Sequence, residues 1–361
     1  MRLVHLAGYG GPYAGSFVPM LRAVMAAGRQ RGWSCEAVFG PAARDREWLA
    51  ELGEDGIPVR LVPSGSRAAA SATVSSLLAE SDAPTILHTH FTAFDIPCAR
   101  ASRRSATVVF WHLHTPHGGS LRLRARNRLK YTVFGRRVDQ ILCVSAELAD
   151  VVAARGAPRD RVAYVPNAIG AERFRLAAQA EREEARRALG VRPGQHVLVH
   201  FGWDWHRKGG DLFCAAVARL REAGRDVVGI TVGGRDEAGP AVRTVSPRED
   251  VRTFYAAANV FMSPSRAEGT PYSVLEAILT GTAVVASDIP GHRDVSAPAC
   301  VLAPLDAGAL AGAAAALLDR PPSVVGSDAR GGHDWVRMNR GLAAWTAALM
   351  DRYESVTGVG A

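Results

Sequence analysis

The sequence has few cysteines, and they are far apart. Its five cysteines include no C-x-x-C pair, and the two nearest in sequence, Cys98 and Cys143, are 45 positions apart. This pattern favours neither a structural zinc site nor a disulfide framework, and it fits a reducing compartment. We therefore expect a cytoplasmic protein.

Long apolar runs are also missing. No run reaches the roughly 20 residues that a membrane-spanning helix needs. The first residues, MRLVHLAGYG, lack the charged, apolar and small-residue regions of a signal peptide. With 48% hydrophobic and 22% charged residues, the 361-residue chain has the composition of a globular protein and suits two domains.

Lysine is almost absent. Of the 43 basic residues only Lys130 and Lys208 are lysines, so the arginine and alanine excess is typical of GC-rich coding, as in actinomycetes. Part of the net charge of +8 therefore says nothing about partners. A lysine that remains in such a chain is of interest.

Seven basic residues and no acidic residue lie between Arg122 and Arg137. The simpler interpretation is a solvated helix face enriched by coding bias. The functional interpretation is a contact with an anionic acceptor or a peripheral contact with the inner membrane face. Because no recognition motif accompanies the charge, we expect no nucleic-acid partner.

Strand and helix patterns alternate along the chain. Strand patterns such as RLVHLA, TILHTHF and ATVVFWHLH alternate with helical patterns, and the alternation restarts at HVLVHFG after a polar connector. Such alternation predicts parallel sheets covered on both faces. We predict an α/β fold of two Rossmann-like doubly wound domains facing a cleft, residues 1–170 and 171–334. A last amphipathic helix is expected around Trp335–Tyr353, within a C-terminal segment 335–361.

A glycine-rich loop, within HLAGYGGPYAGSF, follows the first strand pattern. A G-x-G-x-x-G fingerprint that starts at Gly8 needs a glycine where Tyr13 stands, and no clear acidic ribose ligand ends the second strand pattern, so the sequence does not support NAD binding. Gly10 and Gly11 would let backbone amides approach a phosphate in front of the next helix. A tight turn without a ligand is the alternative.

The most specific pattern is PSRAEGTPYSVLEAILTGTAVVAS, in which seven residues separate Glu268 from Glu276. Thr270 is a natural N-cap and Pro271 a natural first helical residue. Gly281 is a natural C-terminal stop. We therefore expect Glu268 just before a helix and Glu276 inside it.

The amides of residues 269–272 should then lie free at the positive end of that helix. Such a place can hold an anion by its backbone, while the two carboxylates accept hydrogen bonds from sugar hydroxyls.

This segment resembles the E-x7-E signature of retaining GT-B glycosyltransferases, most closely glycosyltransferase family 4. The glycine loop, ATVVFWHLHTP, VDQILCVSAELAD, RVAYVPNAIGAERF and VLVHFGWDWHRKGGDLF resemble further motifs of that family in the same order. The resemblance covers nearly the whole chain. It implies a GT-B fold, an acceptor-binding N-domain, a C-domain that binds a nucleotide-diphosphate sugar, and a last helix that crosses back onto the N-domain.

The resemblance also implies roles for particular residues. Gly10 and Gly11 match the loop beside the donor diphosphate, and His114 matches the active-site histidine that contacts the transferred sugar. Lys208 matches the family lysine that binds the donor phosphates. The expected catalytic residues are His114, Arg207, Lys208 and Glu268. The expected donor-binding residues are Gly10, Gly11, Gly202, Gly269, Thr270, Pro271, Tyr272 and Glu276, with Glu276 on the ribose.

Some positions depart from the family pattern. Trp203 follows Gly202 where the family has an arginine, and we expect Arg207 to supply that charge. The interdomain motif reads NAIG at residues 167–170 and lacks the family aspartate. No D-x-D triplet occurs, which agrees with a metal-independent enzyme that uses cationic side chains and helix dipoles. We therefore expect no metal and no cofactor besides the nucleotide-sugar co-substrate.

Five histidines fall within 30 residues: His88, His90, His112, His114 and His117. Two residues apart on a strand, paired histidines lie on one face, and both pairs end strand patterns of a parallel sheet. HLHTPH is close to the H-x-H-x-D-H of metallo-hydrolases, but Pro116 replaces the aspartate. Few carboxylates that could orient metal ligands are nearby, so zinc is the minor alternative.

The sequence thus predicts retaining transfer of a sugar from a nucleotide-diphosphate sugar to a hydroxyl acceptor. The acceptor classes left open are an aminoglycoside-like specialised metabolite and a cell-surface glycan or lipid. The rival functions are a GT-B-fold epimerase or phosphorylase, a zinc hydrolase, and a nucleotide-sugar binder without turnover.

Overall fold

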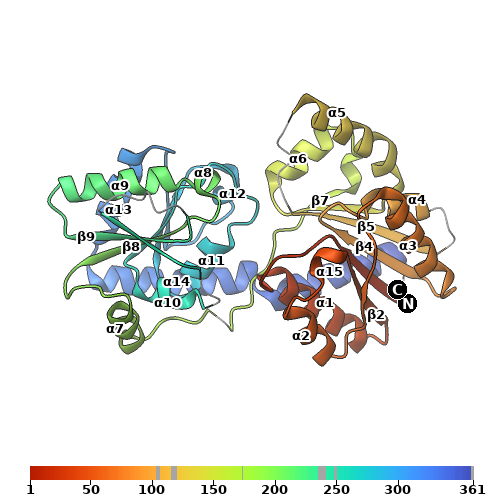
Figure 1. The fold of residues 1–361 in the computed structure, drawn as a ribbon, viewed down its shortest axis with the longest axis horizontal. Helices are drawn as coiled ribbons and strands as arrows, with labels where there is room; N and C mark the ends of the chain where they lie inside the picture. Colours follow the sequence, from red (N-terminus) through yellow and green to blue (C-terminus); the bar gives the residue numbers. More distant parts are fainter. Residues whose placement is uncertain (103–105, 115–119, 173, 235–240, 248–249, 359–361) are drawn as a thin grey trace. The chain divides into compact units, whose positions relative to one another are not determined.

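The structure is a computed structural model that describes residues 1–102, 106–114, 120–172, 174–234, 241–247 and 250–358. His117 and Pro116 lie outside the described residues. The chain divides into two compact units (Figure 1). Unit 1 comprises Met1–Ala168 and Leu342–Ala361, and unit 2 comprises Ile169–Gly341. The domain limits expected from the sequence stay a prediction.

Unit 1 holds a parallel sheet in the order β3-β2-β1-β4-β5-β6-β7. Its strands are β1 (Arg2–Ala7), β2 (Ser34–Phe39), β3 (Val59–Leu61), β4 (Thr85–His90), β5 (Thr107–Leu113), β6 (Gln140–Cys143) and β7 (Val162–Tyr164). Its α-helices are α1 (Phe17–Gln30), α2 (Trp48–Glu54), α3 (Arg67–Ala79), α4 (Asp95–Ala101), α5 (Leu121–Leu129), α6 (Ala146–Ala154) and α15 (Leu342–Thr357). Shorter helical segments are η1 (Pro41–Ala43), η2 (Lys130–Phe134), η3 (Gly135–Arg137) and η4 (Arg159–Arg161).

Both faces of this sheet are covered, which explains why its strands read as continuous apolar runs. Alternate residues of each strand point to opposite faces. One core joins Leu3, Ile86 and Phe110 to α1, α2 and α15. The opposite core joins Val4, Leu87 and other strand residues to α3, α4 and α6. The C-terminal helix α15 packs against α1 (Figure 1).

Unit 2 holds a second parallel sheet, in the order β10-β9-β8-β11-β12-β13. Its strands are β8 (His196–Phe201), β9 (Val227–Val232), β10 (Val242–Val245), β11 (Val260–Ser263), β12 (Ala283–Ser287) and β13 (Cys300–Ala303). Its helices are α7 (Gln179–Ala188), α8 (Trp205–Lys208), α9 (Gly210–Glu222), α10 (Arg252–Ala257), α11 (Tyr272–Leu279), α12 (Pro290–Arg293), α13 (Ala307–Leu318) and α14 (Pro322–Arg340). Helices α9 and α13 cover one face, and α7, α10, α11 and α14 cover the other (Figure 1). The predicted α/β class with two parallel sheets is confirmed.

Three local predictions were wrong in detail. The single helix expected around Trp335–Tyr353 is two helices, because Gly341 adopts an extended conformation and pairs with Ile169 in a β-bridge. The basic helix α5 ends at Leu129, and a π-helical turn follows. Helix α11 begins at Tyr272 rather than at Pro271, which becomes its N-cap.

In the part of the chain that the structure describes, no helix combines the length and the apolar character needed to span a bilayer.

Candidate functional site

The order of the strands in unit 2 singles out one place on the sheet. The strand order reverses between β8 and β11, and ligands of such sheets bind beyond the carboxyl ends of the strands at that point. The segment from Gly202 to Lys208 follows β8, and the segment from Pro264 to Pro271 follows β11. The predicted site residues of these two segments therefore converge at the switch point of one sheet, whereas Glu276 lies within α11 and the predicted residues Gly10, Gly11 and His114 lie in unit 1.

Lys208 is held in place by the short helix α8 and by the glycine that ends it. Gly209 has a φ of +71°, and a Cβ there would lie 2.0 Å from the carbonyl oxygen of Pro264. The two segments thus touch at a position that only glycine fits. On the other side, Nε2 of His200 lies 3.0 Å from the carbonyl oxygen of Lys208.

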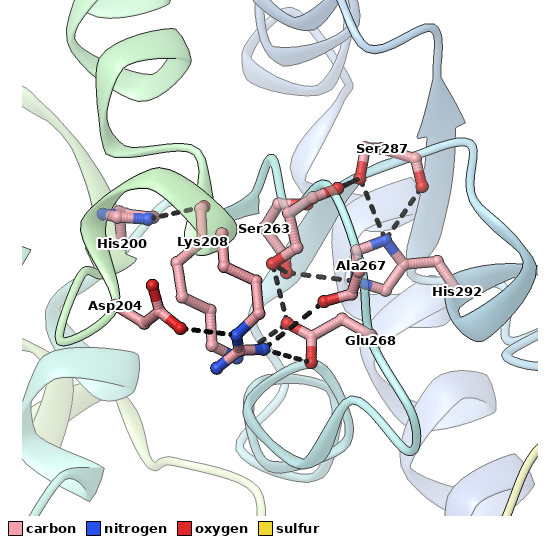
Figure 2. Close-up of polar contacts among 10 residues, drawn as sticks. His200, Asp204, Lys208, Ser263, Ala267, Glu268, Ser287 and His292 are labelled. Carbon is pink, nitrogen blue, oxygen red and sulfur yellow. Dashed lines mark hydrogen bonds and ion pairs between the residues drawn. The ribbon is translucent and has the colours of Figure 1, made fainter. Parts of the chain in front are cut away.

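Glu268 is the centre of the polar contacts at this switch point. Its side chain and that of Lys208 point toward each other, and Lys208 Nζ lies 2.7 Å from Oε1 (Figure 2). The Ser265 hydroxyl donates to the same oxygen at 2.7 Å. Arg207 Nη1 lies 3.5 Å from Oε2 and also donates to the Ala267 carbonyl at 3.3 Å. One buried carboxylate therefore orders both cations expected to bind phosphate.

The charges explain why Glu268 stays ionised although it is buried. Burial by itself raises the pKa of this carboxyl. The Lys208 ammonium and the hydrogen bond from Ser265 outweigh the burial, so the pKa of Glu268 lies below its ordinary value. Arg207 is further shared with Asp204, whose Oδ2 lies 2.7 Å from its Nε. The cluster is close to neutral until an anion competes for the two cations.

A second group of polar residues holds Ser265, the hydrogen-bond donor to Glu268, in place. The sequence patterns did not predict this group. His292 is fully buried and lies between Ser263 and Ser287, with Nε2 3.2 Å from the Ser263 hydroxyl (Figure 2). Its Nδ1 lies 2.8 Å from the Ser287 carbonyl oxygen. The Ser287 hydroxyl also donates to the Ser265 carbonyl at 2.5 Å. Only the position of the serines at strand ends could have indicated this network.

Glu276 lies inside α11, as the spacing predicted. The hydroxyl of the buried Tyr255 donates to its Oε2 at 2.7 Å, and this hydrogen bond fixes the carboxylate rotamer. The start of the helix differs from the prediction. The Tyr272 amide was expected to be free, but it donates to the Thr270 carbonyl at 3.0 Å, and Pro271 has no amide hydrogen.

Trp203, which stands where the resemblance led us to expect an arginine, is an exposed side chain beside this cluster. It is 57% exposed, its ring lies 5.5 Å from that of Phe201, and Lys208 Nζ lies 5.7 Å from its centroid. The preceding Gly202 is buried, and a Cβ there would meet the Thr231 hydroxyl at 2.9 Å. Trp203 therefore offers an aromatic face, and Arg207 brings a guanidinium to the buried carboxylate.

In unit 1 the glycine loop lies at the equivalent place. The strand order reverses between β1 and β4, and the Gly8 amide donates to the His90 carbonyl at 3.2 Å. A Cβ on Gly10 would lie 2.5 Å from that of Ala42, so this glycine has a packing reason as well. The Trp48 indole donates to the Gly11 carbonyl at 3.1 Å, which fixes the loop against α2.

Beside this loop, the structure stacks five histidines on the sheet face that α1 and α15 cover. Strand register places His5 beside His88, and His90 beside His112. We call His5, His88, His90, His112 and His114 the histidine stack. Burial lowers the pKa of every member, to about 3 for His5 and for His114.

The histidine stack contains two groups with the proximity of metal ligands. One side-chain nitrogen from each of His5, His88 and His90 lies within 4.8 Å of the others, and the same holds for His90, His112 and His114. Among the described residues, neither nitrogen of the fully buried His112 has a hydrogen-bond partner. The sequence foresaw two of the contributing strands but missed His5, whose strand pattern carried no second histidine.

Comparison with known proteins places this geometry in a family. Residues 18–168 match the model of the glycosyl transferase 4-like domain, and residues 195–320 match that of the glycosyl transferases group 1. The chain belongs to this glycosyltransferase family. Membership accounts for both sheets, because each model falls within one of the two units.

Relatives with named activities are about 30% identical to this chain over the aligned residues. A 2-deoxystreptamine glucosyltransferase of Streptomyces kanamyceticus is 30% identical over 242 residues, which are 62% of this chain and 62% of the relative. A lipopolysaccharide core biosynthesis mannosyltransferase, LpsB of Rhizobium meliloti, is 29% identical over 54% of this chain and 60% of its own. The chain thus spans about three fifths of the length of these relatives.

Solved structures confirm the GT-B fold. HepE of Anabaena, solved in complex with UDP, has a TM-score of 0.82 at 17% identity and covers 98% of this chain and 100% of its own. A second structure of HepE, in complex with UDP-glucose, has a TM-score of 0.81 at 18% identity over the same shares. At this identity the likeness concerns the fold alone.

Proposed function

We propose that the protein is a retaining, metal-independent glycosyltransferase that moves a sugar from a nucleotide-diphosphate sugar to a hydroxyl acceptor. The observation that carries the proposal is the convergence of Arg207, Lys208 and Glu268 at the switch point of unit 2. Family membership supports it, as do the named activities of the relatives, which are a glucosyltransferase and a mannosyltransferase.

Lys208 and Arg207 are placed to stabilise the negative charge that forms during the reaction. When the anomeric C–O bond breaks, negative charge grows on the departing diphosphate. Lys208 and Arg207, beside the first turn of α11, would stabilise that charge in a partly buried place. One well-placed donor of this kind contributes about 3–4 kcal/mol to the transition state. Arg207 would thereby replace the family arginine missing at Trp203.

The two glutamates would divide the recognition of the donor. Glu276, oriented by Tyr255, would accept hydrogen bonds from the ribose hydroxyls. Glu268 would accept hydrogen bonds from the transferred sugar and stay ionised, so that it also stabilises oxocarbenium-like charge. In unit 1 we assign the Gly10 and Gly11 amides to the diphosphate and His114 to the sugar. The donor-binding roles of Gly202, Gly269, Thr270, Pro271 and Tyr272 belong to the same proposal.

The acceptor remains one of two classes, and the surface of unit 1 bears on the choice. Four arginines of α5, at positions 122, 124, 126 and 128, are exposed, and so are Leu121 and Leu129 on the same helix. Lys130 is not part of this surface, because it is buried in an ion pair with Asp95. Exposed cations beside exposed leucines suit a peripheral contact with an anionic lipid surface. The first relative named above acts instead on 2-deoxystreptamine.

The proposal is tested by turnover in the presence of EDTA. The purified protein is incubated with UDP-, GDP-, ADP- or TDP-glucose and with either 2-deoxystreptamine or vesicles of diacylglycerol and phosphatidylglycerol. Mass spectrometry should detect a hexosylated acceptor together with the free nucleoside diphosphate. The Lys208→Ala variant should slow transfer by about 100-fold or more, the typical effect of one lost donor. Glu222→Ala, at an exposed glutamate of α9, is the matched control and should transfer at the wild-type rate.

Two results would contradict the proposal. Conversion of a nucleotide sugar incubated alone, detected by NMR, would show an epimerase, which needs no acceptor. Activity lost with EDTA and restored by zinc would favour a hydrolase that uses the histidine stack.

A further inference from the structure

The members of the histidine stack are joined by hydrogen bonds into a continuous chain. Nε2 of His114 lies 3.0 Å from Nδ1 of His90, and Nε2 of His90 lies 2.9 Å from Nδ1 of His5. Nε2 of His5 lies 3.5 Å from the Tyr353 hydroxyl, which also makes a short hydrogen bond to Nδ1 of His88. The chain therefore runs from the end of β5 to the C-terminal helix α15.

A neutral imidazole carries one donor and one acceptor nitrogen, so the polarity of one hydrogen bond sets that of the next. Burial keeps these rings neutral because it lowers the pKa of each one. Only two polarities are then self-consistent. In one, His114 carries its proton on Nε2, and in the other it carries the proton on Nδ1.

The Tyr353 hydroxyl decides between them. A phenol is a stronger donor than an imidazole N–H, and an imidazole nitrogen is a stronger acceptor than a phenol oxygen. Both partners of this hydroxyl are imidazoles, so the lengths of the two contacts decide: the phenol proton lies on the closer contact, to Nδ1 of His88, and the phenol oxygen accepts from Nε2 of His5 at 3.5 Å. Nδ1 of His5 then accepts from Nε2 of His90, and Nδ1 of His90 accepts from Nε2 of His114.

Ring stacking fixes the plane of the His114 ring independently of this chain, and the hydrogen bond to His90 fixes which ring nitrogen faces His90. Its imidazole stacks on Phe91 with centroids 4.6 Å apart and on His112 with centroids 4.3 Å apart. Among the described residues, the hydrogen bond to His90 is the one that His114 makes. Its Nδ1 is thus the nitrogen left for a ligand, on a side chain that is half-buried.

We propose that Tyr353, His5 and His90 are positioning residues that hold His114 as the Nε2–H tautomer, so that its Nδ1 lone pair accepts a hydrogen bond from a hydroxyl of the bound sugar. This inference rests on the role of His114 in the proposed function. Through Tyr353, which lies 239 positions after His114 in the sequence, the C-terminal helix α15 would help to set the protonation of the sugar-binding histidine.

The test reads the tautomer directly and needs no activity. Histidine side chains of the full-length protein are labelled with ¹⁵N, and long-range ¹H–¹⁵N correlation distinguishes protonated ring nitrogens from unprotonated ones. His114→Ala, which removes one set of signals, provides the assignment. In the wild-type protein His114 should be protonated at Nε2 alone.

Tyr353→Phe removes one oxygen atom and leaves the ring in place. It should convert the His114 signals to a mixture of both tautomers and lower kcat about tenfold, the size of one lost hydrogen bond, with an unchanged KM for the donor. Tyr131→Phe is the matched control, since Tyr131 is also buried in unit 1 but lies in the opposite core. It should leave the tautomer unchanged.

Each outcome bears on one claim. A His114 protonated at Nδ1 in the wild type, or a tautomer unchanged in Tyr353→Phe, overturns the inference whatever the activity. A stoichiometric metal in the purified protein, with the ring nitrogens shifted by coordination, also overturns it and assigns the stack to a metal site. The predicted tautomer in a protein without transferase activity leaves the hydrogen-bonded chain intact and contradicts the proposed function.

Discussion

Glu268 and Lys208 restrain each other at the carboxyl ends of β8 and β11. The ammonium lies 2.7 Å from a carboxylate that is only 8% exposed, so each charge is partly neutralised before any ligand arrives. A bound diphosphate has to compete with Glu268 for Lys208 and Arg207. Glu268 should therefore weaken the binding of the diphosphate, while its contact with the transferred sugar should speed the chemical step.

Replacing Glu268 by glutamine should separate these two effects. Glu268→Gln removes the competing charge, so UDP should bind as tightly as in the wild type or more tightly, while kcat falls at least tenfold because the sugar loses a carboxylate. Glu276→Gln should do the reverse and weaken UDP binding, because this carboxylate serves the ribose. Calorimetry with UDP and steady-state kinetics measure both. Weaker UDP binding by Glu268→Gln would show that Glu268 does not compete for the cations.

At the scale of single elements, the loop that carries the cations depends on one glycine. Helix α8 spans only Trp205–Lys208, and Gly209 joins it to α9 with its backbone against Pro264. The short helix has little stability of its own, since most helical stability comes from packing. Contact with the loop after β11 is therefore what fixes the position of Lys208.

A methyl group at that contact should displace the loop. Gly209→Ala adds a Cβ 2.0 Å from the Pro264 carbonyl oxygen, besides the strain of a left-handed φ. Gly224→Ala is the matched control, because Gly224 has a φ of +81° with nothing within 4 Å of the added Cβ. Left-handed strain costs about 1–2 kcal/mol in either variant. Gly209→Ala should lose more stability in urea unfolding and should also weaken UDP binding; equal effects of the two substitutions would contradict the packing argument.

The histidine stack should make unit 1 sensitive to acid. Burial lowers the pKa of these histidines below the value of about 6.5 that they have in the unfolded chain. Below that pH the unfolded state binds more protons, so the free energy of unfolding falls as the pH drops toward the folded-state values. Each neutral histidine contributes about 1.4 kcal/mol per pH unit in this window.

Replacing His112 by leucine tests this linkage. Urea unfolding between pH 7.5 and pH 5 should show a steep loss of stability in the wild type. In His112→Leu, the slope of the free energy of unfolding against pH should fall by the contribution of one proton, about 1.4 kcal/mol per pH unit. The free energy of unfolding at pH 5 should be higher than in the wild type. His112 is the best choice because, among the described residues, its nitrogens have no partners to lose. Identical slopes in the two proteins would contradict the assignment of a depressed pKa to this residue.

At the scale of the whole molecule, the sequence correctly predicted the features that follow from repeated local patterns, namely the two sheets and the place of the glutamates relative to α11. Alternating strands and helices predicted two parallel sheets, and the spacing of Glu268 and Glu276 placed one before α11 and one inside it. The short strands β10 and β13 were missed, because four residues at a sheet edge carry little periodicity. The break at Gly341 was missed because a single glycine is tolerated in a helical pattern.

Contacts between distant segments were beyond the reach of sequence patterns. The ion pair of Lys208 with Glu268 joins residues 60 positions apart, and it was expected only as two separate ligand groups. His5 and Tyr353 are separated by 348 positions, and only the packing of α15 on the sheet brings them together. The family resemblance supplied the role of His114, but it could not supply the chain of imidazoles behind it.

The central claim is that unit 2 binds a nucleotide-diphosphate sugar through Lys208 and Glu276 without a metal ion. The most direct measurement is titration calorimetry of the full chain with UDP-, GDP-, ADP- and TDP-glucose in EDTA. We predict saturable binding of at least one of them, weakened about tenfold or more in Lys208→Ala and in Glu276→Ala but unchanged in Glu222→Ala, since a hydrogen bond to a charged group contributes about 1.5–3 kcal/mol. Binding of none of the four sugars, or equal affinity in all the variants, would contradict the account.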